Sequence, residues 1–295
     1  MTRKGIDVSF AQGKIDWKAV KGSKKADFVI IRAGYGREST QKDAQFENNY
    51  KGCKENGIPC GAYWYSYADS VEDAKREARA CIETIKGKQF EYPIYFDLEE
   101  KFQFDRGGDF CDSIVKAFCN ELEKAGYWAG LYCSTNYLNN IISPSVAGRY
   151  ALWVAQYYDE CTYNKAAHGM WQYTSSSKVN GISGNVDADE CYVDYPKLIK
   201  TKGLNGFEKE KPVLDADGYK KGSNTIGCLS LKEMLMIAKK LGINKYGMDE
   251  NKEFGNGTQN AVNYMLGVWG YKQNGIAGEN FIKKLAAEIN KKIKV

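Results

Sequence analysis

The stretch Tyr92-Pro93-Ile94-Tyr95-Phe96-Asp97-Leu98-Glu99 is an apolar run that ends in an Asp-x-Glu pair. Its aromatic residues and its isoleucine are typical of a buried strand. Alternate residues of a strand point to the same side, with Cα atoms about 6.6–7 Å apart. We therefore expect Asp97 and Glu99 to face one pocket while Leu98 packs behind them.

Two carboxyl groups in one pocket repel each other when both are charged, so one of them keeps its proton to a higher pH. Such a pair supplies one acid together with one base or charge stabiliser near neutrality, which is what cleavage of a glycosidic bond requires. Acidic residues also end the first and last strand candidates, at Asp7 and Asp187. The alternative for each of these aspartates is an ordinary turn or cap.

Seven further short runs have strand character, and polar segments with helical periodicity separate several of them. These runs are residues 5–9, 28–33, 61–65, 130–133, 151–156, 170–173 and 185–187, with helical patterns over 70–85 and 111–125. Alternation of strand and helix predicts a mainly parallel sheet, and eight strands in about 200 residues predict an α/β fold of the (β/α) barrel type. The later strands leave little room for helices, so we expect an irregular barrel.

The pattern changes after residue 200. We expect a barrel domain over 1–200, a polar linker over 201–212 and a small all-α domain over 213–295, with amphipathic helices near 231–241, 261–269 and 281–289. Residues 207–295 contain 15 Lys and 10 Asp or Glu, a balance of +5, whereas the rest of the chain is neutral. This charge indicates either an anionic surface as partner or ordinary solubilising charge.

Composition excludes several chemistries. There is one histidine, so zinc sites with two or three His ligands cannot form, and the nine cysteines form no Cys-x-x-Cys pair. We predict no metal and no cofactor, and free thiols in a reducing compartment. No apolar run reaches the roughly 18–20 residues of a membrane span, and an acidic residue interrupts the N-terminus. We expect no membrane insertion, no signal peptide and no nucleic-acid partner.

Aromatic residues are abundant, at 13% of the chain, and several lie at or near strand ends. They either stack on sugar rings or fill the barrel. The candidates for substrate binding are Tyr35, Tyr63, Tyr65, Tyr132, Trp153 and Trp171. Arg32 follows a strand run, where it is expected to pair with a pocket carboxylate, to hold a carboxylate of the substrate, or to form a structural ion pair.

These motifs occur in an order that resembles the glycoside hydrolase family 25 lysozymes of phage endolysins and bacterial autolysins. The matching pieces are Gly5-Ile6-Asp7-Val8-Ser9, residues 28–33, Gly61-Ala62-Tyr63-Trp64-Tyr65, Phe96-Asp97-Leu98-Glu99, residues 152–156, Trp171-Gln172-Tyr173 and Gly184-Asn185-Val186-Asp187. Trp64 departs from the common family pattern.

The resemblance implies a flattened barrel that hydrolyses the β-1,4 bond between N-acetylmuramic acid and N-acetylglucosamine. It implies that Glu99 is the general acid and Asp97 its partner, while Asp7 and Asp187 shape the charge of the pocket. Tyr63 and Tyr132 are then the foremost pocket aromatics. Substrate-assisted, covalent and inverting routes all stay open at this point.

The segment 213–295 is similar to small helical peptidoglycan-binding domains, through two related loops at 248–258 and 273–279. The implied partners are peptidoglycan and anionic wall polymers. The implied location is the host bacterial cytoplasm until lysis, and then the cell wall. A chitinase-like glycosidase and a non-catalytic cell-wall lectin are the two alternative functions.

Overall fold

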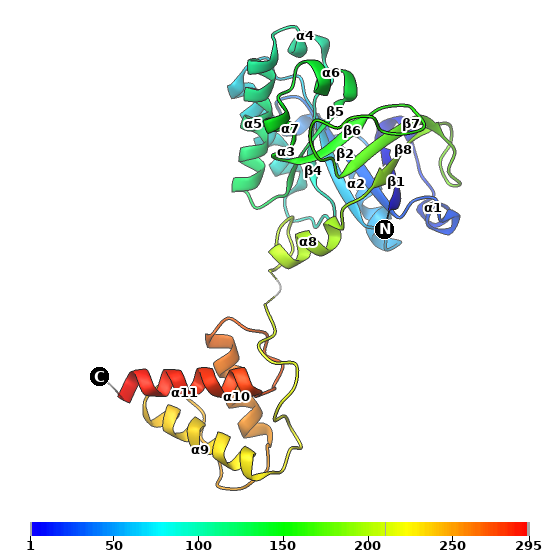
Figure 1. The fold of residues 1–295 in the computed structure, drawn as a ribbon. Helices are drawn as coiled ribbons and strands as arrows, with labels where there is room; N and C mark the ends of the chain where they lie inside the picture. Colours follow the sequence, from blue (N-terminus) through cyan, green and yellow to red (C-terminus); the bar gives the residue numbers. More distant parts are fainter. Residues whose placement is uncertain (1, 210, 294–295) are drawn as a thin grey trace. The chain divides into compact units, whose positions relative to one another are not determined.

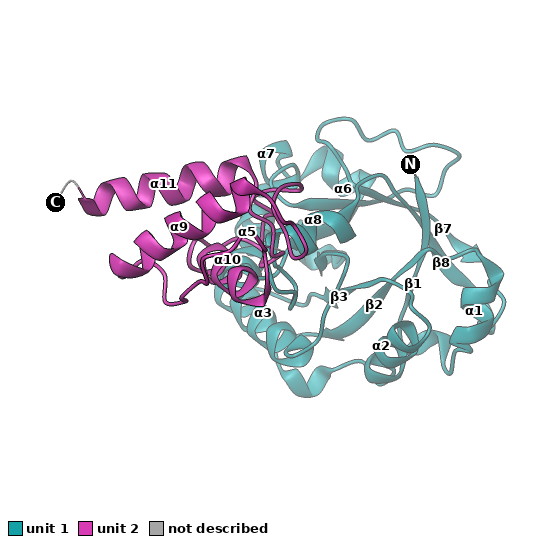
Figure 2. Ribbon diagram, turned by 90° about the horizontal axis from the view of Figure 1, so that it is seen from below, with its two compact units in different colours: residues 1–209 teal, residues 210–295 magenta. Residues whose placement is uncertain are grey.

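The chain forms two compact units, residues 1–209 and 210–295 (Figure 2). The computed structural model describes residues 2–209 and 211–293. The first unit extends beyond the predicted boundary at residue 200 because Asn205 is part of it. The buried Asn205 side chain donates to the carbonyls of Phe90 and Tyr92 and accepts from the amide of Trp128. The predicted linker is therefore too long at its N-terminal end.

The first unit is an eight-stranded closed barrel, as predicted (Figure 1). Its strands follow chain order around the barrel, and the pairs from β1 to β7 are parallel. The strands are β1 (Arg3–Val8), β2 (Phe28–Tyr35), β3 (Cys60–Tyr65), β4 (Ile94–Asp97), β5 (Ala129–Ser134), β6 (Ala151–Ala155), β7 (Met170–Ser177) and β8 (Val186–Cys191).

Strand β8 runs antiparallel to both of its neighbours, β7 and β1. No helix separates β7 from β8, so the chain turns back directly. We had expected Asp187 at the end of the last strand, but it lies at the start of β8. The antiparallel direction nevertheless brings Asp187 beside Asp7, its register partner near the end of β1.

Helices cover the strands unevenly, which makes the barrel irregular. The longest, α3 (Val71–Ile85) and α5 (Gly108–Lys124), pack on each other, and Phe118 of α5 lies against Phe96 of β4 with ring centroids 4.5 Å apart. The others are α1 (Trp17–Ser23), α2 (Phe46–Glu55), α4 (Lys101–Phe104), α6 (Thr135–Asn140), α7 (Pro144–Ala147) and α8 (Tyr195–Lys202), with short 3-10 turns at Phe10–Gln12 and Ser39–Gln41.

Large rings fill the lower part of the barrel because two glycines leave space for them. A Cβ atom on Gly5 would lie 2.2 Å from the Phe28 ring, and one on Gly130 would lie 2.4 Å from the Tyr95 ring. Together with Trp153, these rings belong to a buried apolar cluster. This cluster closes the barrel below, and the polar side chains gather above it.

The second unit contains α9 (Ile226–Lys240), α10 (Asn256–Val268) and α11 (Glu279–Ile293), in line with the predicted helical part. Its own apolar core includes Leu231, Leu235, Val262, Phe281 and Leu285. Among the helices of the described residues, none has the length and apolar character that crossing a membrane requires.

Candidate active site

A pocket of about 130 Å³ opens among the inward-facing side chains of the barrel. Parallel strands end at this edge and β8 begins there, so residues far apart in the chain meet. The lining consists of Asp7, Arg32, Tyr63, Tyr65, Asp97, Glu99, Tyr132, Trp153, Gln172 and Asp187. All four carboxylates singled out from the sequence are therefore neighbours.

Asp97 and Glu99 differ in their exposure. Asp97 is the last residue of β4 and is buried, whereas Glu99 lies two residues beyond the strand and is exposed at the mouth. Burial raises the pKa of Asp97 well above its usual value, and the charge of Glu99 adds to that rise. Partial burial of its carboxyl group also raises the pKa of Glu99, although the hydrogen bond between Glu99 and Asp97 lowers that pKa. The pair therefore holds a proton to higher pH than either isolated group.

Asp7 and Asp187 share one hydrogen-bond donor. The Nε2 atom of Gln172 lies 2.8 Å from Asp7 Oδ2 and 3.3 Å from Asp187 Oδ2. Burial raises the pKa of Asp7 well above its usual value, and the charges of Asp189 and Asp187 add to this. Burial, followed by the charge of Glu99, raises the pKa of Asp187 to about 6.

Gln172 is the central residue that the sequence analysis did not single out. Its Oε1 atom accepts hydrogen bonds from the hydroxyls of Tyr132 at 2.8 Å and Tyr157 at 3.0 Å. The amide thus joins two tyrosines to two aspartates. Its position in Trp171-Gln172-Tyr173 could have indicated this role, because consecutive residues of a strand point to opposite sides and only one of Trp171 and Gln172 can face the pocket.

Asp189 was also missed, although Asp187-x-Asp189 repeats the spacing of Asp97-x-Glu99. Asp189 is fully buried, and its Oδ1 accepts the Trp153 indole N–H at 2.9 Å. Burial raises its pKa well above the usual value. Trp153 is itself buried and lies beside Tyr132 with ring centroids 4.5 Å apart, so it forms part of the wall.

Two of the predicted substrate-binding residues lie outside this lining. The Trp171 indole donates to the Gln156 carbonyl at 2.7 Å and packs beside Tyr173. Tyr35 is exposed at the end of β2, and its ring centroid lies 5.9 Å from the Arg32 guanidinium carbon. Tyr65 lines the pocket, and its hydroxyl donates to Glu100 at 2.9 Å.

Arg32 forms an ion pair below the mouth. Its Nε atom lies 2.6 Å from Oδ2 of the buried Asp43, which also accepts the Phe10 amide at 3.0 Å. The Phe10 ring lies 4.6 Å from the guanidinium carbon. Of the three pairings expected from the sequence, a structural ion pair is present, and Arg32 still lines the pocket.

A second hollow of about 280 Å³ continues from the first, since Glu99 and Tyr132 line both. Its other walls come from Leu98, Ser134, Tyr137, Ala155, Gln156 and Tyr157. Glu99 therefore faces a groove that is longer than the carboxylate pocket. Within the described residues, no group of three or more His, Cys, Asp or Glu side chains is arranged to hold a metal ion.

An α/β barrel with carboxylates that converge at its mouth defines a class of barrel proteins whose site can support acid–base chemistry. Comparison with known proteins narrows this class. The family model described as Glycosyl hydrolases family 25 matches residues 6–182. The chain belongs to this family.

Curated relatives include the autolytic lysozyme of Clostridium acetobutylicum, which is 32% identical over 187 residues, covering 63% of this chain and 55% of the relative. Lysozyme M1 of Streptomyces globisporus is 26% identical over 215 residues, covering 66% of this chain and 69% of the relative. The chain thus spans about half the length of the first of these proteins.

Solved structures give the same barrel. The modular autolysin LytC of Streptococcus pneumoniae, in complex with a synthetic peptidoglycan ligand, matches with a TM-score of 0.59 and 31% identity over 65% of this chain and 47% of LytC. The CTP1L endolysin matches with a TM-score of 0.59 and 21% identity, covering 99% of this chain and 100% of that protein. The second match is evidence of fold alone.

Proposed function

We propose that the protein is a peptidoglycan hydrolase that cleaves the β-1,4 bond between N-acetylmuramic acid and N-acetylglucosamine. The convergence of Asp7, Asp97, Glu99 and Asp187 on one pocket is the observation that carries the proposal. Family membership and the autolytic lysozyme of Clostridium acetobutylicum support the same reaction class. The peptidoglycan ligand bound to LytC supports the substrate class.

In this proposal Glu99 is the general acid that protonates the leaving oxygen. Glu99 is exposed in the groove and its pKa is raised, so it can hold a proton until substrate binds. Asp97 is its buried partner and stabilises positive charge that develops at the sugar carbon. Asp7 and Asp187 set the charge of the opposite wall, where the side-chain amide of Gln172 donates to both carboxylates.

The substrate lies along the groove formed by the two adjoining hollows in this proposal. Tyr63, Tyr65 and Tyr132 present rings or hydroxyls at the carboxylate pocket, and aromatic faces stack on the apolar faces of sugar rings. Trp153 contributes wall surface, because its indole N–H is already bonded to Asp189. Arg32, Tyr35 and Trp171 stay predictions for contact with the substrate.

The test is mass spectrometry of peptidoglycan digested by the wild-type protein and by Glu99→Gln. A muramidase releases fragments with a new muramic acid at the reducing end, and the variant releases orders of magnitude less. A new glucosamine end, or faster release from chitin than from cell walls, favours the chitinase-like alternative. Wall binding by both proteins without any release favours the lectin.

We assign wall binding to the second unit in the same proposal. Residues 207–295 carry a balance of +5, which suits anionic wall polymers. Lys245 lies over the rings of Tyr246 and Tyr264, at 5.3 and 4.9 Å, so positive charge and aromatic surface occur together. The site of action is then the bacterial cell wall, reached from the host cytoplasm at lysis.

A further inference from the structure

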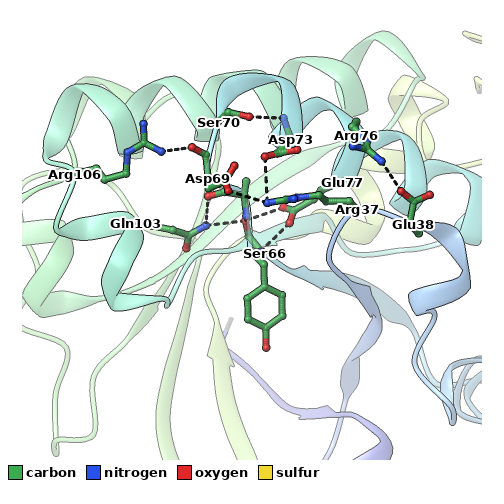
Figure 3. A network of polar contacts seen from close by, with 12 residues as sticks. Arg37, Glu38, Ser66, Asp69, Ser70, Asp73, Arg76, Glu77, Gln103 and Arg106 are labelled. Carbon is green, nitrogen blue, oxygen red and sulfur yellow. Dashed lines mark hydrogen bonds and ion pairs between the residues drawn. The ribbon is translucent and has the colours of Figure 1, made fainter.

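A buried carboxylate holds the turn that follows β3 (Figure 3). Glu77, on α3, has no exposed surface, and it does not line the active-site pocket. Its Oε2 atom accepts the Ser66 hydroxyl at 2.7 Å, and its Oε1 atom accepts the Tyr67 amide at 2.8 Å. Burial of a carboxylate lowers the stability of the fold unless such hydrogen bonds compensate the loss of hydration. A buried carboxylate beside the strand that carries Asp97 therefore suggests a role for Glu77.

The contacts of Ser66 fix the direction of every proton in this network. Its Oγ atom accepts the Ala68 amide at 3.1 Å and the Gln103 side-chain amide at 3.1 Å. A hydroxyl has two acceptor lone pairs and one proton, so the proton of Ser66 must point at Glu77. Both oxygens of Glu77 therefore act as acceptors. A glutamine would aim an N–H at another donor, or at an oxygen whose lone pairs are occupied.

Ser66 contacts both ends of the segment that carries the catalytic pair, one through its main-chain amide and the other through its hydroxyl. At one end, the Ser66 amide donates to the Asp97 carbonyl at 3.0 Å. At the other end, Gln103 of α4 donates to Ser66 Oγ and to the Ala68 carbonyl, at 3.1 and 3.0 Å. Glu99 lies between these two attachment points.

Charged groups surround the buried carboxylate on its outer side. Arg37 lies 3.2 Å from both Asp69 and Asp73, and Arg106 donates to the Asp69 carbonyl (Figure 3). Burial is the largest influence on the pKa of Glu77 and raises it to about 7, while the hydrogen bonds from Ser66 and Tyr67 and then the charge of Arg37 lower it. The Arg37–Asp69 pair is exposed and contributes little by itself, whereas Asp73 is partly buried.

We propose that Glu77 is a positioning residue for Asp97 and Glu99, acting through Ser66 to clamp both ends of residues 97–103. This inference rests on the proposed hydrolase function. It requires only that the geometry of the catalytic pair depends on the turn after β3. Displacements of about 1 Å in a catalytic group lower rates by up to about 100-fold.

The test compares Glu77→Gln and Ser66→Ala with Ile85→Ala, each in the full-length chain, using soluble peptidoglycan fragments as substrate. Ile85 is buried at the opposite end of α3 and serves as the control for lost stability. We expect both network variants to lose about 10- to 100-fold in kcat per folded molecule while KM changes less than about 3-fold. Ile85→Ala melts at a lower temperature but keeps its kcat.

A purely structural role makes activity follow the folded fraction in all three variants, and that result overturns the inference. If Glu77→Gln does not fold, Ser66→Ala decides, and an unchanged kcat in Ser66→Ala rejects the positioning role. An inactive wild-type protein that binds cell walls contradicts the proposed function instead. The two failures are therefore distinguishable.

Discussion

Glu99 and Asp97 are two residues apart, yet they occupy different environments. Asp97 is 3% exposed at the end of β4, while Glu99 reaches the groove from the loop that follows. Glu99 is accessible to the glycosidic oxygen of a bound substrate, whereas Asp97 is buried behind it. This difference is the physical reason to assign the proton donor to Glu99 and the supporting charge to Asp97.

Gln172 connects the two aspartates to two tyrosines, so its loss affects both walls of the pocket. In Gln172→Leu, Asp7 and Asp187 lose their donor and the Tyr132 hydroxyl loses its acceptor. We expect kcat/KM on soluble peptidoglycan fragments to fall about 100-fold, equivalent to about 3 kcal/mol.

The matched control is Tyr173→Phe, which changes the residue that follows Gln172 on β7. Tyr173 does not line the carboxylate pocket, and its ring packs beside Trp171. We expect kcat/KM to change less than about 3-fold, or about 0.6 kcal/mol. A larger loss in Tyr173→Phe than in Gln172→Leu contradicts this assignment of the pocket lining.

Asp187 places a pH-dependent cost on the folded barrel. Its pKa rises from 3.8 to about 6, so its neutral form is favoured in the folded state. The cost is absent below the unfolded pKa, grows as pH rises through about 4 to 6, and stays constant above. Asp187→Asn should therefore be more stable than the wild type at pH 8 by about 1 kcal/mol, after allowance for solvent exposure.

Chemical unfolding of the barrel unit at pH 8 and at pH 4 measures this difference. We expect the advantage of Asp187→Asn to disappear at pH 4, and the variant to be less active on cell walls. A variant that is destabilised at pH 8 and equal to the wild type at pH 4 shows the opposite sign, and the raised pKa is then wrong.

At the residue scale, the sequence identified the acids and missed the groups that hold them. Asp97 and Glu99 were readable because an Asp-x-Glu pair ends an apolar strand. Gln172 was not, because an amide between two aromatic residues has no chemical signature until the direction of each side chain is known. The catalytic roles themselves stay predictions.

At the scale of elements, the direction of β8 determines how the mouth is built. An antiparallel strand brings its first residues, and with them Asp187, to the edge where β1 and β4 end. The sequence predicted that a last strand exists but not its direction. A three-residue apolar–acidic pattern at 185–187 carries no information on strand direction, and only pairing with β1 and β7 settles it.

One aspartate fixes the last helix of the second unit. Asp215 is buried, and its carboxylate accepts the amides of Gly278, Asn280 and Phe281 at 3.2, 3.3 and 2.8 Å. The N–H groups at the start of a helix have no partner within the helix, so Asp215 supplies the acceptor for these amides of α11. We expect Asp215→Ala to lower the unfolding free energy of this unit by about 2 kcal/mol.

Thermal unfolding of residues 210–295, which have their own apolar core, provides the measurement. Asp217→Ala is the control, because Asp217 is exposed two residues further along the same loop. Equal melting temperatures for the wild type and Asp215→Ala contradict the capping role.

At the scale of the whole molecule, the chain separates a neutral barrel from a basic helical unit. The sequence placed the boundary near residue 200, where the strand and helix pattern of the barrel stops. Residues up to 209 nevertheless belong to the barrel, because Asn205 bonds backbone groups beside β4 and β5. A single long-range side-chain contact of this kind leaves no mark in local composition.

Removing the second unit should separate wall binding from chemistry. We expect residues 1–209 to cleave soluble peptidoglycan fragments at the wild-type rate but to release much less material from intact cell walls. Sedimentation of residues 210–295 with walls should weaken as salt rises, since the unit carries excess positive charge. Failure of this fragment to sediment at low salt rejects the wall-binding role.

The most direct test of the central claim is a carbon-13 NMR titration of the side-chain carboxyls in the wild type, with Asp97→Asn and Glu99→Gln used to assign the signals. The raised pKa values of Asp97 and Glu99 predict that this pair loses its last proton at a higher pH than exposed carboxyl groups of the same chain do. If both carboxyls titrate at their ordinary values of 3.8 and 4.5, the pocket does not retain an acid, and the proposed mechanism is contradicted.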